Sequence, residues 1–155
     1  MSAALNNMVA FETDLLERRR HQRNERLTLP LRTDEDVVAL RKHVRERAVG
    51  IALSLVDQTK LVTAASELAR NTIKYGGGGE VHLDALDDGL RKGVGLIFVD
   101  AGPGIPDMEL ALRDGYTTGG GLGLGLSGSK RLADEFDIAT RVGEGTAVSI
   151  VKWKR

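Results

Sequence analysis

The sequence contains no cysteine among its 155 residues. Disulfides, thiol nucleophiles and zinc–thiolate centres all need cysteine, so these kinds of site are excluded. Any metal bound by this chain is therefore expected to have oxygen ligands. A chain without cysteine also fits a reducing compartment, and we expect a cytoplasmic protein.

The sequence also lacks net charge and a long apolar run. Lys and Arg together number 22, as do Asp and Glu, so we expect neither a nucleic-acid groove nor a membrane-surface patch. No stretch approaches the ~20 apolar residues of a membrane helix. Near the first residue, Glu12 and Asp14 lie close to Phe11, which is unlike a secretory signal. We expect a soluble intracellular protein with one main domain.

Residues 1–26 form a distinct region. Apolar residues recur there at helical spacing, and a cluster of arginines follows, which indicates an amphipathic extension with a basic end. Its apolar residues could rest on their own domain or contact a second copy or a partner, and both alternatives stay open. The apolar positions are Leu5, Met8, Val9, Leu15 and Leu16, and the basic ones are Arg18, Arg19, Arg20, Arg23 and Arg26.

The remaining residues, 27–155, read as one domain in which helical patterns come first and strand patterns later. An edge strand over 27–31 contains Pro30. A helix capped by Thr33 has apolar residues every three or four positions from Val37 to Leu55, and we expect all of them in the core. A second helix is expected from an N-cap at Asp57 to Lys74.

Strands are expected over 81–86, 93–99, 138–142 and 146–153, with a helix from about 126 to 133 between them. Since this order is not a regular alternation of strand and helix, it predicts an α/β two-layer sandwich with a mixed, mostly antiparallel sheet.

Asp100 follows the apolar run Val94–Val99 and precedes Gly102 and Gly104. A carboxylate at a strand end can accept a hydrogen bond from the exocyclic amine of adenine, whereas the carbonyl oxygen of guanine would repel it. Neighbouring glycines let the backbone pass close to a base. This pattern predicts a site that prefers ATP to GTP, although such a motif alone is also typical of an ordinary turn.

A glycine-rich run leads into the helix expected near residue 126. Backbone N–H groups in such a loop and at a helix N-terminus can bind phosphates. The dinucleotide fingerprint also matches here, but no strand precedes it, and no Walker lysine follows, so this is a different kind of phosphate site. The run comprises Gly119, Gly120, Gly121, Leu122, Gly123, Leu124 and Gly125.

Glu67, Asn71 and Lys74 lie at positions i, i+4 and i+7 of the second helix and share one face. The amide oxygen of Asn71 is a suitable ligand for Mg²⁺, and Glu67 could accept a proton from an attacking hydroxyl. Lys74 either reaches a phosphate or only stabilises the helix C-terminus. Without the other motifs, this face would be read as an ordinary solvated one.

Read together, Glu67-x-x-x-Asn71, Asp100 to Asp107, the glycine run and Gly143 to Thr146 resemble the GHKL ATPase superfamily, to which gyrase, Hsp90, MutL and histidine kinases belong. The pattern is most similar to the anti-sigma-factor serine kinases, and among them to the RsbT-type switch kinases of the bacterial stressosome. The resemblance covers about residues 27–155 and does not extend to 1–26.

This resemblance implies a Bergerat fold with ATP between helices and sheet, under a lid over about 107–121. It implies Mg²⁺ on Asn71, Glu67 as base, Asp100 on the adenine amine, Gly102 and Gly104 along the base, and Thr146 near Asp100. It further implies a serine/threonine kinase for STAS-domain scaffold and antagonist proteins that activates a PP2C-type phosphatase when free. No arginine directly precedes the glycines of the lid, so the cation at the γ-phosphate stays open among Lys74, Arg113 and Lys130.

Two rival functions remain. An anti-sigma factor that sequesters a sigma factor would carry the same nucleotide motifs. A detached catalytic domain of a histidine kinase ranks lower, because neither His21 nor His43 has the surroundings of a phosphoacceptor, and no dimerising helix pair is evident.

Overall fold

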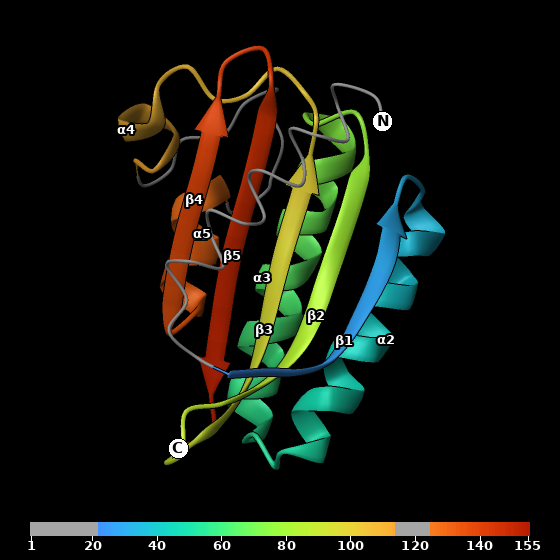
Figure 1. Cartoon of the computed structure of the whole chain (residues 1–155), viewed down its shortest axis with the longest axis vertical. Helices are drawn as coiled ribbons and strands as arrows, with labels where there is room; N and C mark the ends of the chain where they lie inside the picture. Colours follow the sequence, from blue (N-terminus) through green and yellow to red (C-terminus); the bar gives the residue numbers. More distant parts are fainter. Residues whose placement is uncertain (1–21, 114–124) are drawn as a thin grey trace.

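The computed structural model describes residues 22–113 and 125–155, and Figure 1 shows the whole chain. The described residues form a sheet with helices packed on one of its faces. The elements in chain order are β1 (Gln22–Leu31), α2 (Asp34–Gly50), α3 (Leu55–Lys74), β2 (Gly79–Asp87), β3 (Lys92–Asp100), α4 (Met108–Ala111), α5 (Gly125–Leu132), β4 (Glu135–Arg141) and β5 (Gly145–Trp153).

The sheet has five strands in the order β1-β2-β3-β5-β4. All four neighbouring pairs are antiparallel, so the described sheet is antiparallel throughout rather than mixed. In Figure 1, the helices α2, α3 and α5 lie behind the sheet. The expected two-layer α/β sandwich is therefore confirmed, and so is the edge position of β1, where Pro30 needs no ladder partner on its free side.

The helix α2 begins as the sequence predicts. Thr33 accepts a hydrogen bond from the backbone N–H of Asp36, and the Asp36 carboxylate accepts one from the backbone N–H of Thr33, which completes a capping box. The expected apolar face is confirmed as far as Ala48. Leu55 was wrongly assigned to it, because α2 ends at Gly50 and the Leu55 side chain is 76% exposed.

The helix α3 begins earlier than the sequence predicts. Ser54 is its N-cap, with an extended backbone and a hydroxyl that accepts a hydrogen bond from the N–H of Asp57 at 3.1 Å. Asp57 therefore lies in the first turn instead of capping it. There its carboxylate lies 3.4 Å from the buried ammonium of Lys152, a contact with β5 that the sequence did not indicate.

The main core lies between the sheet and the helices α2 and α3. Alternate residues of β3 point into it, namely Val94, Leu96 and Phe98. Asp100 continues this alternation by two residues, so its side chain leaves the sheet on the helix-covered face, just beyond the end of the apolar core. Because side chains alternate between the two faces of β3, the Asp100 carboxylate lies near the C-terminal end of α3.

A buried ionic cluster ties the far end of β5 to the rest of the fold. The ammonium of Lys152 lies 3.2 Å from the Asp134 carboxylate, which also accepts a hydrogen bond at 2.7 Å from the backbone N–H of Trp153. Burial acts to raise the pKa of Asp134, but the bonds from Trp153, Arg155 and Lys152 outweigh it and lower the pKa overall. Asp134 is therefore held as a carboxylate.

No helix among the described ranges is long and apolar enough to cross a membrane.

Candidate functional site

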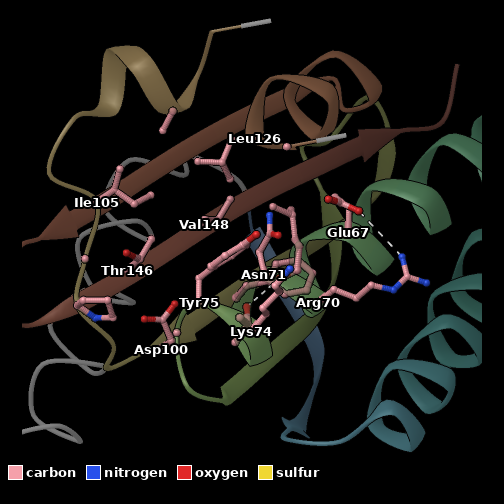
Figure 2. A pocket seen from close by; sticks show the side chains of 18 of the residues that line it. Glu67, Arg70, Asn71, Lys74, Tyr75, Asp100, Ile105, Leu126, Thr146 and Val148 are labelled. Carbon is pink, nitrogen blue, oxygen red and sulfur yellow. Dashed lines mark hydrogen bonds and ion pairs between the residues drawn. The ribbon is translucent and has the colours of Figure 1, made fainter. Parts of the chain in front are cut away.

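A cavity of about 550 Å³ lies between the C-terminal half of α3, the ends of β3 and β5, the segment 103–111 and the start of α5 (Figure 2). Its volume is within the usual range for small-molecule sites. Five polar residues that the sequence singled out line it, namely Glu67, Asn71, Lys74, Asp100 and Thr146. The structure therefore brings together side chains from α3, β3 and β5 that lie far apart in the sequence.

Asp100 is 9% exposed at one end of the cavity. Its Oδ1 accepts a hydrogen bond at 2.9 Å from the backbone N–H of Gly102. Burial raises the pKa of the Asp100 carboxyl, and the backbone N–H groups of Gly102 and Thr146 only partly oppose this shift. A carboxylate can accept about four hydrogen bonds, so capacity remains for a donor that enters from the cavity.

Two glycines allow the chain to pass close to Asp100. A β-carbon on Gly76 would lie 2.6 Å from Cβ of Asp100, and one on Gly102 would lie 2.7 Å from Cα of Gly76. Gly102 does not line the cavity. The close approach of residues 76 and 102 already requires a residue without a side chain here, and contact of Gly102 with a base stays a prediction.

Gly104 does line the cavity, and its φ of +75° is a conformation that favours glycine. The carbonyl carbon of Arg141 would lie 2.7 Å from an added β-carbon. A glycine at position 104 is thus required by the backbone conformation and by packing against β4. Contact of Gly104 with a base stays a prediction.

A chain of hydroxyl bonds fixes the cavity wall beside Asp100. Oγ1 of Thr146 lies 2.9 Å from Oγ1 of Thr140, which also accepts a hydrogen bond at 3.0 Å from the backbone N–H of Ile105. Thr146 is the cross-strand partner of Asp100, as expected from its placement near that residue. The segment after β3 is thereby tied to the β4–β5 hairpin.

Glu67 and Asp100 lie at opposite ends of the pocket in Figure 2, with Asn71 and Tyr75 between them. The Glu67 side chain is 13% exposed, and its carboxylate lies 4.0 Å from the guanidinium of Arg70, one turn further along α3. Lys74 also lines the cavity, and its ammonium lies 5.2 Å from the centre of the Tyr75 ring. The two carboxylates thus lie at opposite ends of a cavity whose middle is lined mostly by apolar side chains.

The apolar side chains that line that middle were not predicted from the sequence. They come from five separate segments and are Tyr75, Phe98, Ile105, Leu126 and Val148. Tyr75 could have been noticed, because it follows directly on the helix face that carries Asn71. The others look like ordinary core residues in the sequence. Only the packing of α5 against α3, and the bond from Ile105 to Thr140 of β4, bring them to one cavity.

Part of the predicted phosphate loop lies outside the described residues. Gly125 and Leu126, at the start of α5, line the cavity. Gly119, Gly120, Gly121, Leu122, Gly123 and Leu124 fall outside the described ranges, as do residues 114–121 of the expected lid. Of that lid the structure shows the short helix α4, whose Leu110 and Ala111 line the cavity.

The described residues hold no cluster of three or more Asp, Glu, His or Cys side chains suited to a metal ion. At the Glu67 end of the cavity, the described oxygen donors are the side chains of Glu67 and Asn71. Such a donor set fits Mg²⁺, which commonly keeps several waters and binds through one or two protein ligands together with the phosphates of its nucleotide. A metal here would depend on the nucleotide.

Comparisons with known proteins agree with this geometry. The profile of the family described as histidine kinase-, DNA gyrase B- and HSP90-like ATPases matches residues 56–155. The chain is 42% identical over 132 residues to the serine/threonine-protein kinase RsbT of Bacillus subtilis, covering 85% of this chain and 99% of that one. It is 31% identical over 106 residues to the anti-sigma F factor of Anoxybacillus flavithermus, covering 64% and 71% respectively.

A solved structure of the RsbU and RsbW domains of a Mycobacterium tuberculosis protein is similar in fold, with a TM-score of 0.59 and 20% sequence identity. The match covers 85% of this chain and 33% of that longer one. At this level of identity the likeness shows the fold alone.

Proposed function

Because the chain belongs to the family of histidine kinase-, DNA gyrase B- and HSP90-like ATPases, we propose that it is an ATP-dependent protein serine/threonine kinase. The likeness to the kinase RsbT over most of both chains supports this reaction. The observation that carries the nucleotide assignment is the buried Asp100 carboxylate at one end of a cavity whose other end holds Glu67 and Asn71.

In this proposal, adenine binds at the Asp100 end. The exocyclic amine donates to the carboxylate, and the base lies against the apolar middle formed by Tyr75, Ile105 and Val148. The polyphosphate extends toward Asn71 and Glu67, where the glycine-rich run that leads into Gly125 supplies backbone N–H groups. Guanine would place a carbonyl oxygen against Asp100, so ATP is preferred to GTP.

The phosphoryl transfer needs a base at the other end. Glu67 accepts the proton of a serine or threonine hydroxyl as its oxygen attacks the γ-phosphorus. The bond between that phosphorus and the β–γ bridging oxygen breaks, ADP leaves with the electron pair, and phosphoserine or phosphothreonine is formed. The Glu67 side chain is 13% exposed and lines the cavity, so it is within reach of a hydroxyl that enters at this end.

Asn71 would hold a Mg²⁺ ion together with the phosphates through its side-chain oxygen. Such an ion would supply positive charge to offset the negative charge of the transferring phosphoryl group, as in other phosphoryl-transfer enzymes. The backbone carbonyl of Asn71 accepts the N–H of Tyr75 at 2.9 Å, so the bond that ends the helix does not use the side-chain amide.

We infer from the resemblance to switch kinases that the protein substrates are STAS-domain scaffold or antagonist proteins, and that the free kinase activates a PP2C-type phosphatase. The likeness to RsbT is the support for these partners. A second candidate is an anti-sigma factor that binds a sigma factor, which the 31% identity to an anti-sigma F factor favours.

The test is transfer of labelled γ-phosphate from Mg·ATP to purified STAS-domain proteins of the same genome. Glu67→Ala serves as the control variant and should bind ATP but transfer phosphate at least ~10²-fold more slowly. Label on a serine or threonine supports the kinase. Tight ATP binding without transfer to any of them, together with co-purification of a sigma factor, would favour the second candidate.

A further inference from the structure

The sheet has a second face, opposite the helices α2, α3 and α5, and its side chains are buried although these helices do not cover it. On the central strands β3 and β5, Ile97, Val99 and Ala147 are at most 1% exposed, and Trp153 near the end of β5 is 2% exposed. These residues form clusters separate from the main core. In Figure 1, the helices α2, α3 and α5 of the described residues lie on the other side of the sheet.

Polar side chains on this second face are buried as well. Asp84 of β2 is 0% exposed and is held by Arg26 through bonds of 2.8 and 2.9 Å. Ser149 of β5 is 4% exposed. Residues of adjacent strands in register point to the same face, so Ser149 shares this face with Ile97 of β3 and Asp137 of β4. Hairpin turns at the ends of a sheet cannot bury the middle of its central strands.

Within the chain, the segment 1–21 is suited to cover this face. The other segment outside the described ranges, 114–124, starts and ends on the helix side, because α4 contacts α5 and Gly125 lines the cavity there. By contrast, β1 starts at Gln22, opposite Asp87, at the end of the sheet where Gly93 pairs with Trp153. The segment 1–21 is therefore attached at the end of the sheet where Trp153 lies on the second face.

The sequence of 1–21 matches such a role in its apolar pattern and in charge. Leu5, Met8, Val9, Leu15 and Leu16 fall on one side of a helical projection, and a helix of this length would be about 31 Å long, enough to cross all the strands. Arg18, Arg19 and Arg20 follow. Glu135 and Asp137 lie on the second face at the edge strand β4, so this edge carries charge opposite in sign to those arginines.

We propose that the segment 1–21 docks on the second face of the sheet through its apolar side chains and thereby shields that face from water and from other chains. This interface does not involve the nucleotide cavity, so it is independent of the proposed function. Of the alternatives left open by the sequence, this proposal takes the extension that rests on its own domain.

The absence of cysteine allows a direct test by thiol labelling of the full chain. Ser149→Cys places a thiol on the second face, and Ser66→Cys places one in the main core; both serines are 4% exposed. Into each we would introduce Met8→Glu with Leu15→Glu, which puts two charges among the apolar side chains. Asn7→Glu with Ala10→Glu adds the same charge on the opposite side of the helical projection and is the matched control.

Labelling of the thiol at position 149 should be slow in the parent and in the control. With Met8→Glu and Leu15→Glu it should be at least ~10-fold faster, because the cover opens more often. The thiol at position 66 should stay protected throughout. Fast labelling at position 149 in the parent, or a rate unchanged by the two glutamates, overturns the proposal. So does protection at position 149 that is lost on dilution, since a second copy would then be the cover.

If the two glutamates also expose the thiol at position 66, the whole domain has been destabilised. The milder pair Met8→Ala and Leu15→Ala is then decisive. Faster labelling at position 149 while position 66 stays protected supports the proposal, and equal acceleration at both positions overturns it.

Discussion

Asp100 and Thr146 are cross-strand partners on β3 and β5, so the carboxylate and the hydroxyl enter the cavity side by side. The backbone N–H of Thr146 also stabilises the ionised form of Asp100. The adenine end of the proposed site is therefore built on two neighbouring strands of the sheet, which gives it a more rigid base than a loop would.

Asp100→Asn should weaken ATP binding by about 10- to 100-fold, the value of a charge-assisted hydrogen bond. The new amide can still accept the N–H of Gly102, but its NH₂ group faces the amine of adenine. Titration calorimetry with ATP and GTP measures the effect. If affinity for ATP is unchanged, or if GTP binds the parent as well as ATP does, the assignment of the adenine end is wrong.

The raised pKa of Asp100 makes a prediction about stability. An acid whose pKa is higher in the folded state stabilises the fold below its ordinary value of 3.8, and this contribution is lost as pH rises through the folded pKa. Relative to the parent, Asp100→Asn should therefore become more stable between about pH 4 and pH 7. Urea unfolding of both proteins across this range checks the sign, and a constant difference would contradict it.

Asn71→Ala should remove most of the gain in ATP affinity that Mg²⁺ provides, by about tenfold or more. Binding measured in EDTA should change little, because the metal is then absent. Thr63→Ala, on an exposed part of the same helix, is the control for helix stability. Equal losses with and without Mg²⁺ would show that Asn71 contacts the nucleotide directly.

Gly76→Ala should displace the Asp100 side chain, because the new methyl group would lie 2.6 Å from its β-carbon. We expect weaker ATP binding and a loss of about 1–3 kcal/mol in the free energy of unfolding. The matched control is Gly50→Ala, where no atom lies within 4 Å, and which should be neutral or stabilising. Crystal structures or chemical shifts of Gly76→Ala would locate the displacement.

Asp134→Asn should destabilise the protein at neutral pH by about 1.5–3 kcal/mol, because it weakens bonds to Lys152 and Trp153. The lowered pKa of Asp134 means that this contribution is present above its ordinary value of 3.8 and is lost as pH falls through the folded pKa. The difference from the parent in urea unfolding should thus shrink toward pH 2. Glu46→Gln on the surface of α2 should show neither effect.

Much of the candidate site could be read from the sequence because its polar members have local signatures. Glu67 and Asn71 share a face through helical spacing, and Asp100 stands where an apolar run ends. The apolar residues that line the cavity had no such signature in the sequence. Phe98 and Leu126 are apolar residues of a strand and a helix, and only the tertiary approach of these elements makes them lining residues.

The helix boundaries predicted from the sequence were wrong for a related reason. Ser54 and Asp57 are both good N-caps, and Leu55 continues the apolar spacing of the preceding helix by coincidence. The choice between them depends on the turn at residues 51–52, where Ala52 has a φ of +59°. The turn is followed by Leu53, which is 4% exposed and packs into the core just before Ser54. For Gly102, packing against Gly76 already requires a glycine, so its contact with the ligand stays a prediction.

The strand β5 follows every other strand in the sequence but lies between β3 and β4. During synthesis, β1, β2 and β3 can pair as soon as they emerge, but β4 has no neighbour in the sheet until β5 arrives. Thr146 and Val148, which line the cavity, both belong to β5. Nucleotide affinity should therefore arise together with the completed sheet, and a nascent chain that stops before β5 would be unable to bind nucleotide.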